Sequence, residues 1–461
     1  MNEPARPSAP EPSSLYAAHQ KIYPREVAGR FDRLRRLAVW VLLGLFYLLP
    51  WISWDGRQSV LFDLPARKFY VFGLVFWPQD FFYLTWLLII AGLALFFFTA
   101  LAGRLWCGYA CPQTVWTEVF LRVEYWFEGD RNRRMRLDRG PWNREKLLRK
   151  GGKHLAWVLL ALWTGFTFVG FFTPVRELGT LVLSLSTGPW ETFWILFYGA
   201  ATWGNAGFLR EQVCLYMCPY ARFQSAMFDR DTLIIAYDPA RGEPRGSRGR
   251  RADPRAAGLG DCIDCRACVQ ACPTGIDIRE GLQYECIACA ACVDACDTVM
   301  DRMNYPHGLI RYTSQQALEG QGTHVIRPRM LVYGALLGLL VAGFLVSLAL
   351  RTPVGLDLMR DRNALYRTLA DGSIENVYLL RIVNKDTRAH AYRLSAEGLP
   401  GLVIETDATE HRVGSGEVYS VAARVRVPAT AARGSQPIRV QVQAVDDPGL
   451  TAVHEARFLA P

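Results

Sequence analysis

The 461-residue chain has no cysteine after Cys296, so its last hundred-odd residues cannot form a disulfide-supported extracellular scaffold. No small-residue cleavage site follows the arginine-rich start of the first long apolar run, which predicts a retained helix and not a removed export signal. Hydrophobic residues make up 51% of the chain, yet charged residues still make up 21%. This mixture favours membrane spans joined to polar domains over a uniformly soluble enzyme.

The basic excess of the chain has two interpretations. There are 52 Lys and Arg against 43 Asp and Glu, for a net charge of +9, and such an excess can indicate nucleic-acid binding. In a chain with long apolar runs, the better explanation is that basic loops stay on the cytoplasmic side of a membrane. The sequence therefore predicts membrane lipid as a partner and no nucleic acid.

Five apolar segments approach the ~20 residues needed to cross a bilayer. They lie at 37–53, 81–101, 154–173, 189–209 and 330–350, and the fourth is the weakest because Glu191 and Asn205 interrupt it. Segments 102–153 and 210–329 are rich in basic residues, whereas 174–188 has only Arg176. We expect a multi-pass protein with a cytoplasmic N-terminus and an external C-terminal tail.

The remaining segments complete a multi-domain membrane protein. Residues 1–34 are rich in Pro, Ala, Ser and charge, which predicts a disordered cytoplasmic tail. Residues 35–230 hold four spans, 231–328 a cytoplasmic cysteine-rich domain, and 329–351 the fifth span. Short alternating runs in 352–461 predict an antiparallel β-sandwich of about seven strands. The apolar but interrupted segment 60–79 is expected to be an interfacial or re-entrant piece on the outer side.

Eight cysteines occur in two runs with one spacing. Residues 262–275 are CIDCRACVQACPTG and residues 286–296 are CIACAACVDAC, each C-x2-C-x2-C-x3-C. This is the spacing of bacterial two-cluster ferredoxins, in which the fourth cysteine of each run binds the other run's cluster. Zinc sites, the alternative, usually place two C-x2-C pairs apart. The expected ligand sets of two [4Fe–4S] clusters are Cys262, Cys265, Cys268 and Cys296, and Cys286, Cys289, Cys292 and Cys272.

Four more cysteines occur in two matched C-x-Y-x-C-P motifs, CGYACP at 107–112 and CLYMCP at 214–219. A proline after cysteine predicts that the cysteine caps a new helix, whose dipole lowers the pKa of the thiol. Each motif follows an apolar segment, and both copies have Ala-Gly and then Arg upstream. We infer a duplicated unit that brings together Cys107, Cys111, Cys214 and Cys218.

These four cysteines are the candidate catalytic or metal-ligating residues. Soft thiolates select Cu(I), zinc or iron–sulfur species. The alternative is that they are small buried apolar residues, because free cysteine is among the most buried residue types.

The spans, the paired C-x3-C-P motifs and the two-cluster run together resemble the FixG/RdxA/CcoG family of cbb-type cytochrome c oxidase accessory proteins. The resemblance covers nearly the whole chain except its first ~30 residues. It implies a bacterial inner membrane and a periplasmic immunoglobulin-like domain at 352–461. It also implies a cytosolic electron donor and reduction of Cu(II) to Cu(I) near the C-x3-C-P pairs. Copper is then the substrate or a bound ion, the partners are oxidase assembly factors such as copper transporters or chaperones, and a homodimer is left open.

Two other functions stay open at this point. The quinol-dehydrogenase component of periplasmic nitrate reductase, the NapH type, has the same motifs but ends soon after its ferredoxin segment. Its quinone site would need polar groups among the spans, for which Glu191, Tyr198 and Asn205 are candidates. The third hypothesis is a redox-sensing scaffold that binds the oxidase through its external domain.

Overall fold

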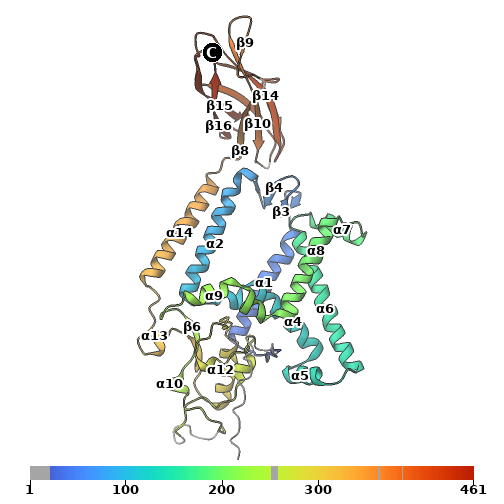
Figure 1. Ribbon diagram of the computed structural model, residues 1–461, viewed down its shortest axis with the longest axis vertical. Helices are drawn as coiled ribbons and strands as arrows, with labels where there is room; N and C mark the ends of the chain where they lie inside the picture. The colour runs from blue at the N-terminus through green and yellow to red at the C-terminus, as the bar shows by residue number, and fades with distance from the viewer. Residues whose placement is uncertain (1–20, 251–257, 362–363, 387) are drawn as a thin grey trace, which may run out of the picture. The chain divides into compact units, whose positions relative to one another are not determined.

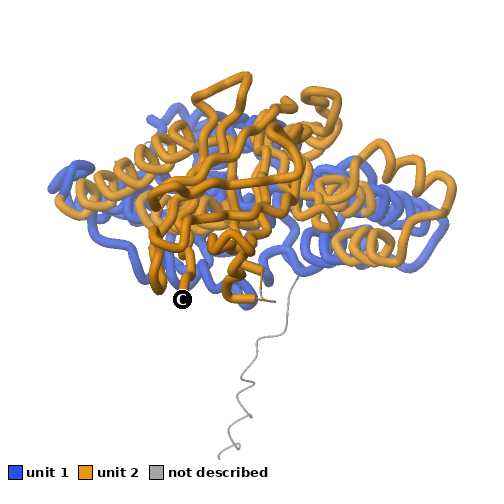
Figure 2. Tube along the Cα trace, turned by 90° about the horizontal axis from the view of Figure 1, so that it is seen from above, with its two compact units in different colours: residues 1–43, 98–161, 200–327 blue, residues 44–97, 162–199, 328–461 orange. Residues whose placement is uncertain are grey.

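The computed structural model describes residues 21–250, 258–361, 364–386 and 388–461 (Figure 1). The chain divides into two compact units, each built from separate stretches of sequence (Figure 2). Unit 1 comprises residues 1–43, 98–161 and 200–327, and unit 2 comprises residues 44–97, 162–199 and 328–461. All twelve cysteines fall in unit 1, so this unit contains the candidate site.

Four helices of the described chain are long and apolar enough to cross a membrane. They are α1 (Arg30–Leu48), α2 (Phe81–Ala102), α6 (Arg144–Val169) and α14 (Pro328–Ala349). The expected span at 189–209 is also helical, but it is divided into α8 (Pro189–Thr202) and the π-helix η3 (Trp203–Leu209). Large apolar side chains such as Trp40, Leu88 and Leu339 are exposed on these helices, which is typical of surfaces that face lipid.

Within unit 2, the apolar helices pack through small residues and hydroxyl groups. Gly165 of α6 lies so close to α8 that a Cβ there would be 2.2 Å from the carbonyl oxygen of Ile195. The Tyr83 hydroxyl of α2 donates to the carbonyl oxygen of Ser347 on α14 at 3.0 Å. Such close backbone approach and interhelical hydrogen bonds are usual where lipid removes the hydrophobic driving force.

Residues 60–79, predicted to be an interfacial or re-entrant piece, consist largely of short strands. Strands β3 (Val60–Asp63), β4 (Lys68–Val71) and β5 (Leu74–Phe76) form an antiparallel sheet, and β1 (Ser53–Trp54) pairs with β2 (Arg57–Gln58). The backbone groups of this segment are thus paired with one another in small sheets. Asp80, just before α2, is buried and pairs with Arg351 at 2.6 Å.

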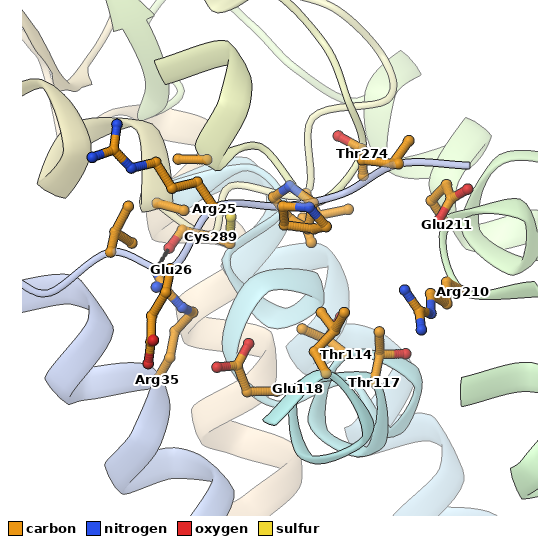
Figure 3. A pocket seen from close by; sticks show the side chains of 18 of the residues that line it. Arg25, Glu26, Arg35, Thr114, Thr117, Glu118, Arg210, Glu211, Thr274 and Cys289 are labelled. Carbon is orange, nitrogen blue, oxygen red and sulfur yellow. Dashed lines mark hydrogen bonds between the residues drawn. The ribbon is translucent and has the colours of Figure 1, made fainter. Parts of the chain in front are cut away.

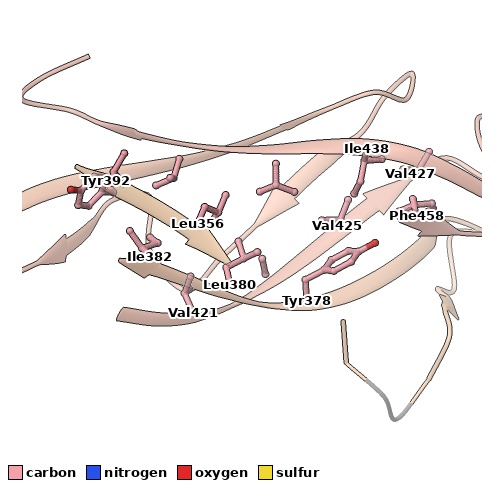
Figure 4. Close-up of a cluster of buried hydrophobic side chains, with 14 of the residues drawn as sticks. Leu356, Tyr378, Leu380, Ile382, Tyr392, Val421, Val425, Val427, Ile438 and Phe458 are labelled. Atoms are coloured by element: carbon pink, nitrogen blue, oxygen red, sulfur yellow. The ribbon is translucent and has the colours of Figure 1, made fainter. Parts of the chain in front are cut away.

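The C-terminal part is a sandwich of two antiparallel sheets, as expected. One sheet has the order β12–β14–β10–β8 with β9 on β10, and the other has the order β13–β11–β15–β16. Alternating inward residues form the core, among them the fully buried Leu380, Val425, Val440 and Phe458 (Figure 4). The strands are β8 (Val354–Arg360), β9 (Arg367–Thr368), β10 (Ile374–Asn384), β11 (His390–Glu397), β12 (Val403–Glu405), β13 (His411–Val413), β14 (Val418–Val427), β15 (Ser435–Ala444) and β16 (Thr451–Leu459).

Unit 1 combines short helices with one two-stranded sheet. Strand β6 (Ile234–Tyr237) pairs with β7 (Ile310–Thr313), so the two ends of the eight-cysteine segment lie side by side. Between these strands, α11 (Ala267–Ala271) lies within the first cysteine run and contains Cys268, and α12 (Ala291–Met303) contains the last two cysteines of the second run; the two helices pack together. Further helices of this unit are α3 (Leu105–Tyr109), α4 (Pro112–Glu128), α5 (Arg131–Arg139), the π-helix η4 (Val213–Met217), α9 (Pro219–Ala226), α10 (Pro239–Gly242), the 3-10 helix η5 (Ile278–Glu280) and α13 (Gln315–Leu318).

The expected disordered tail is only partly testable, because residues 1–20 lie outside the described residues. For residues 21–34 the prediction is wrong, since α1 begins at Arg30 and the segment before it makes hydrogen bonds to distant residues of the same unit. The Tyr23 hydroxyl donates to Asp138 at 2.7 Å, and the carbonyl oxygen of Pro24 accepts from Arg134 at 2.6 Å. Composition indicated disorder because it cannot show these long-range partners.

Candidate electron-transfer site

The first three cysteines of one run and the last cysteine of the other line a common cavity. Cys262 and Cys265 lie on the loop before α11, Cys268 lies in the first turn of α11, and Cys296 reaches the same cavity from α12. Cys265 is exposed, whereas the other three are buried. The structure therefore brings together the first expected ligand set around one cavity, with Cys265 at the protein surface.

The second expected set, Cys272, Cys286, Cys289 and Cys292, also lines one cavity, together with Cys268. Because Cys268 lines both cavities, the two cavities are neighbours. Cys289 and Cys292 are buried, and Cys272 and Cys286 are partly buried. Two adjacent redox groups would form a continuous path for single electrons.

The backbone of the two loops repeats residue for residue. Asp264 and Arg266 flank Cys265 with φ of 53° and 55°, and Ala288 and Ala290 flank Cys289 with φ of 54° and 60°. Left-handed conformations cost ordinary residues roughly 1–2 kcal/mol each, so their repetition indicates a functional constraint. Turns of this kind point successive amide N–H groups into a concave surface, which is how many iron–sulfur sites bind their anionic core.

These thiols fit an iron–sulfur cluster better than a single ion. In the described ranges, no three His, Cys, Asp or Glu side chains converge closely enough to hold one metal ion. The thiols are instead distributed around cavities, as the corners of a bulky four-iron cube require. An all-cysteine donor set with inward amides is the chemistry that [4Fe–4S] clusters use.

The two C-x3-C-P motifs have the predicted local structure. Cys111 is the N-cap of α4, which begins at Pro112, and Cys218 is the N-cap of α9, which begins at Pro219. The residues before the caps differ, because the first motif contains the α-helix α3 and the second contains the π-helix η4. The two motifs therefore have the same structure where the helices after the prolines begin, but their backbones differ before that point.

The structure brings the four thiols of these motifs together. Burial first, and then the neighbouring Cys111 and Cys107 thiols, raise the pKa of Cys214 to about 12. Burial also raises the pKa of Cys107, Arg104 opposes this rise, and Cys111 and Cys218 add to it. These four thiols therefore lie near one another and beside the cation of Arg104, although in the described residues no three of them converge closely enough to hold one metal ion as they stand.

The expected lowering of the thiol pKa at the helix starts is wrong for Cys111. Its pKa is raised, because burial outweighs the backbone amides of Gln113 and Thr114, which do lower it as expected for a helix start. Desolvation penalises the charged thiolate more than two amides stabilise it. A bound cation would supply the missing charge.

The first motif packs directly against the loop of the second ligand set. A Cβ at Gly108 would lie 2.8 Å from the carbonyl oxygen of Ile287 and 2.9 Å from that of Ala288, so only glycine fits. Cys107 belongs to the same buried cluster of side chains as Cys289. Arg104 donates to the carbonyl oxygen of Tyr284, just before Cys286. The thiol site and the second cavity are therefore in contact.

A cavity of about 110 Å³ joins the two halves of the site (Figure 3). Cys214 lines it from the second motif, and Cys289 lines it from the second cysteine run. Its remaining wall combines four carboxylates with four guanidinium groups, those of Glu26, Asp32, Glu118 and Glu211 and those of Arg25, Arg35, Arg122 and Arg210. The cavity is therefore strongly charged, with both signs present in equal number.

We expect Gly108→Ala to destabilise the protein by about 1–3 kcal/mol, the usual cost of inserting a methyl group into a packed interior. The added methyl would meet two backbone carbonyls, which cannot move aside as a flexible side chain can. Gly151→Ala on α6 is the matched control, because a Cβ there has open space around it. The thermal unfolding midpoints of both variants check this, and equal midpoints would contradict the contact.

Sequence reasoning missed the partners of the thiols. Arg104 was visible as the arginine after Ala-Gly in the duplicated unit, but its equivalent Arg210 instead pairs with Glu124 at 2.5 Å. Gln224, whose side-chain oxygen lies 3.0 Å from the sulfur of Cys107, had no local signal. Tertiary packing alone selects these partners.

The candidate quinone residues have other surroundings. The Tyr198 ring packs against Phe168, and the backbone oxygen of Asn205 accepts from the Gln113 amide at 2.9 Å. Glu191 lies in the first turn of α8. None of Glu191, Tyr198 and Asn205 lines the cavities described above.

Together, these features define a membrane iron–sulfur protein of electron transfer. Family models match in agreement: a 4Fe-4S dicluster domain at 209–315, a 4Fe-4S binding domain at 84–134, and the immunoglobulin-like fold at the C-terminus of FixG at 344–461. The second model covers the first C-x3-C-P motif.

The chain belongs to the FixG/RdxA family. It is similar to protein RdxA of Cereibacter sphaeroides, with 40% identity over 96% of this chain and 98% of the relative. Protein RdxB of the same organism is 44% identical over 86% of this chain and 88% of the relative. Nitrogen fixation protein FixG of Rhizobium meliloti is 40% identical over 84% of this chain and 81% of the relative.

Proposed function

We propose that this protein reduces Cu(II) to Cu(I) at Cys107, Cys111, Cys214 and Cys218, for the assembly of cbb-type cytochrome oxidase. The observation that carries the proposal is the contact of Gly108 with the backbone between Cys286 and Cys289. Through this contact, the thiol site adjoins the second cluster's ligand loop and can receive electrons from it. The family resemblance supplies copper as the substrate.

The exposure of the cysteines gives the path a direction. Cys265 is exposed, so its cluster is the one a soluble electron donor would reach. The cavity of Cys286, Cys289 and Cys292 adjoins the thiol site. When bound, the two clusters accept and release electrons one at a time. Electrons would thus pass from the donor to the exposed ligand set, then to the buried ligand set, and finally to the thiol site.

The thiol site suits a one-electron reduction of copper. Cu(II) takes up one electron to give Cu(I), and soft thiolates bind Cu(I) in preference to Cu(II). A bound metal ion lowers the pKa of the thiols that ligate it and so releases their protons. This effect would offset the rise that burial causes in the pKa of Cys214. Burial of Cys107 limits the access of water to the reduced ion.

The topology proposed for this function follows the charges. Basic segments 102–153 and 210–329 lie in the cytoplasm, where a soluble donor has access to Cys265. The β-sandwich lies in the periplasm of a bacterial inner membrane, where it would contact assembly partners such as copper transporters or chaperones. A homodimer is compatible with this arrangement.

Acceptor choice tests the proposal. The full-length protein is purified anaerobically and reduced, and either Cu(II) or a soluble ubiquinone analogue is added. We expect Cu(II) to reoxidise the clusters and the quinone to leave them reduced, as followed by the cluster absorbance. Reoxidation by quinone alone would establish a quinol dehydrogenase, and reoxidation by neither would establish a scaffold or sensor.

A further inference from the structure

A second charged cavity, of about 470 Å³, lies at the basic end of α6 and is lined by no cysteine. Its wall combines four cations with large aromatic rings, whereas the thiol site is formed by cysteines. The principal lining residues are Lys21, Lys150, Lys153, Arg210, Trp157 and Phe208. The electron path described above does not use this cavity.

Buried carboxylates hold these cations in place. Glu124 and Glu128 of α4 are fully buried, with Lys153 2.8 Å from Glu128 and Arg210 2.5 Å from Glu124. Burial raises the pKa of Glu124, but Arg210, Lys21 and further cations outweigh it and lower the pKa to about 2. The carboxylate is therefore ionised, and the cavity is a fixed arrangement of charges.

The cations outnumber the carboxylates in this network. Lys150 pairs with both Asp138 and Glu128, and Lys21 pairs with Asp138. The printed ion pairs join five cations to three carboxylates, and Glu211 adds one further carboxylate to the cavity wall, so positive charge is in excess. The ion-paired members are Lys21, Arg134, Lys150, Lys153 and Arg210 against Glu124, Glu128 and Asp138. An anion bound in the cavity would offset this excess.

The helix that carries this cavity continues into an apolar surface. α6 meets the length and composition of a membrane span. Beyond Lys153, Leu155 and Leu159 are 62% and 59% exposed. In this arrangement, the negative headgroup of a phospholipid would lie in the cationic cavity, and its acyl chains would lie along the apolar surface of the helix.

We propose that this cavity binds the phosphate of an anionic phospholipid, with the acyl chains along α6. The ammonium groups of Lys150 and Lys153 and the guanidinium group of Arg210 are donors for phosphate oxygens. His154, whose ring stacks on Phe208 with centroids 5.7 Å apart, forms the wall toward the acyl chains. A neutral quinone would leave the surplus charge unbalanced.

Native mass spectrometry of the full-length protein in detergent tests this site. Phosphatidylglycerol is titrated, and we expect one tightly bound lipid per chain, with phosphatidylcholine bound more weakly. Lys150→Gln and Lys21→Gln should each weaken phosphatidylglycerol binding about fivefold, the usual contribution of one lysine beside an anionic lipid. The Lys21 side chain is 38% exposed, so Lys21→Gln tests the site without disturbing a buried residue.

Arg144→Gln is the matched control, because it removes one charge from an exposed position on the same helix. It should bind phosphatidylglycerol as the unchanged protein does. Equal weakening by Arg144→Gln, or equal binding of phosphatidylcholine, would overturn the site. Inorganic phosphate that displaces the lipid at equal concentration, or a ubiquinone analogue that does so, would also overturn it.

Discussion

Replacing Cys107, Cys111, Cys214 and Cys218 together by serine should slow the reoxidation of reduced clusters by Cu(II) about a hundredfold or more, or roughly 2.7 kcal/mol in barrier. The variant loses the soft ligands that stabilise Cu(I), while the cluster ligands are untouched. The four thiols lie near one another, so a single serine leaves three soft ligands and has a smaller effect. Stopped-flow absorbance measures the rate.

Two controls separate loss of the thiol site from loss of the fold. Iron should stay near eight per chain in the quadruple variant, as two four-iron clusters require. Met217→Leu changes an exposed side chain within the second motif and should leave the rate unchanged. A quadruple variant that reacts with Cu(II) as fast as the unchanged protein would refute the role of these thiols.

The second large effect is an asymmetry between the two cluster sites. Cys292→Ala and Cys265→Ala should each lower iron from about eight to about four per chain. Only Cys292→Ala should abolish reoxidation by Cu(II), because it removes the cluster that adjoins the thiol site. In Cys265→Ala the buried set remains in contact with Gly108 and still delivers its electron.

Iron analysis and stopped-flow absorbance on the same preparations check this asymmetry. Cys265 is exposed and Cys292 is buried, so the Cys292 variant is also expected to be the less stable of the two. Equal Cu(II) reactivity of the two variants would mean that electrons leave the clusters by another route.

Much of the site was predictable because its signals are local. The cysteine spacing fixes which thiols lie on one loop, and the structure lines one cavity with each expected set. The proline after Cys111 and Cys218 fixes the helix starts, since proline suits the first turn of a helix. Hydrophobic periodicity likewise indicated the β-sandwich.

The remaining features depend on contacts that no local pattern records. Gly108 is one of many glycines, and only the neighbouring loop shows why it cannot carry a side chain. Residues 21–29 have the composition of a free tail but bind Asp138 and Arg134 more than a hundred residues away. The pKa of Cys111 is raised because the thiol is buried. The position of a cysteine at the start of a helix does not reveal its burial.

The yield of Cu(I) tests the central claim most directly. Fully reduced protein is mixed anaerobically with excess Cu(II), and Cu(I) is measured with a specific chelator while the cluster absorbance is followed. The account predicts about two Cu(I) per chain, one for each cluster electron, formed as the clusters reoxidise. Clusters that stay reduced in the presence of Cu(II), or that reoxidise without forming Cu(I), would contradict it.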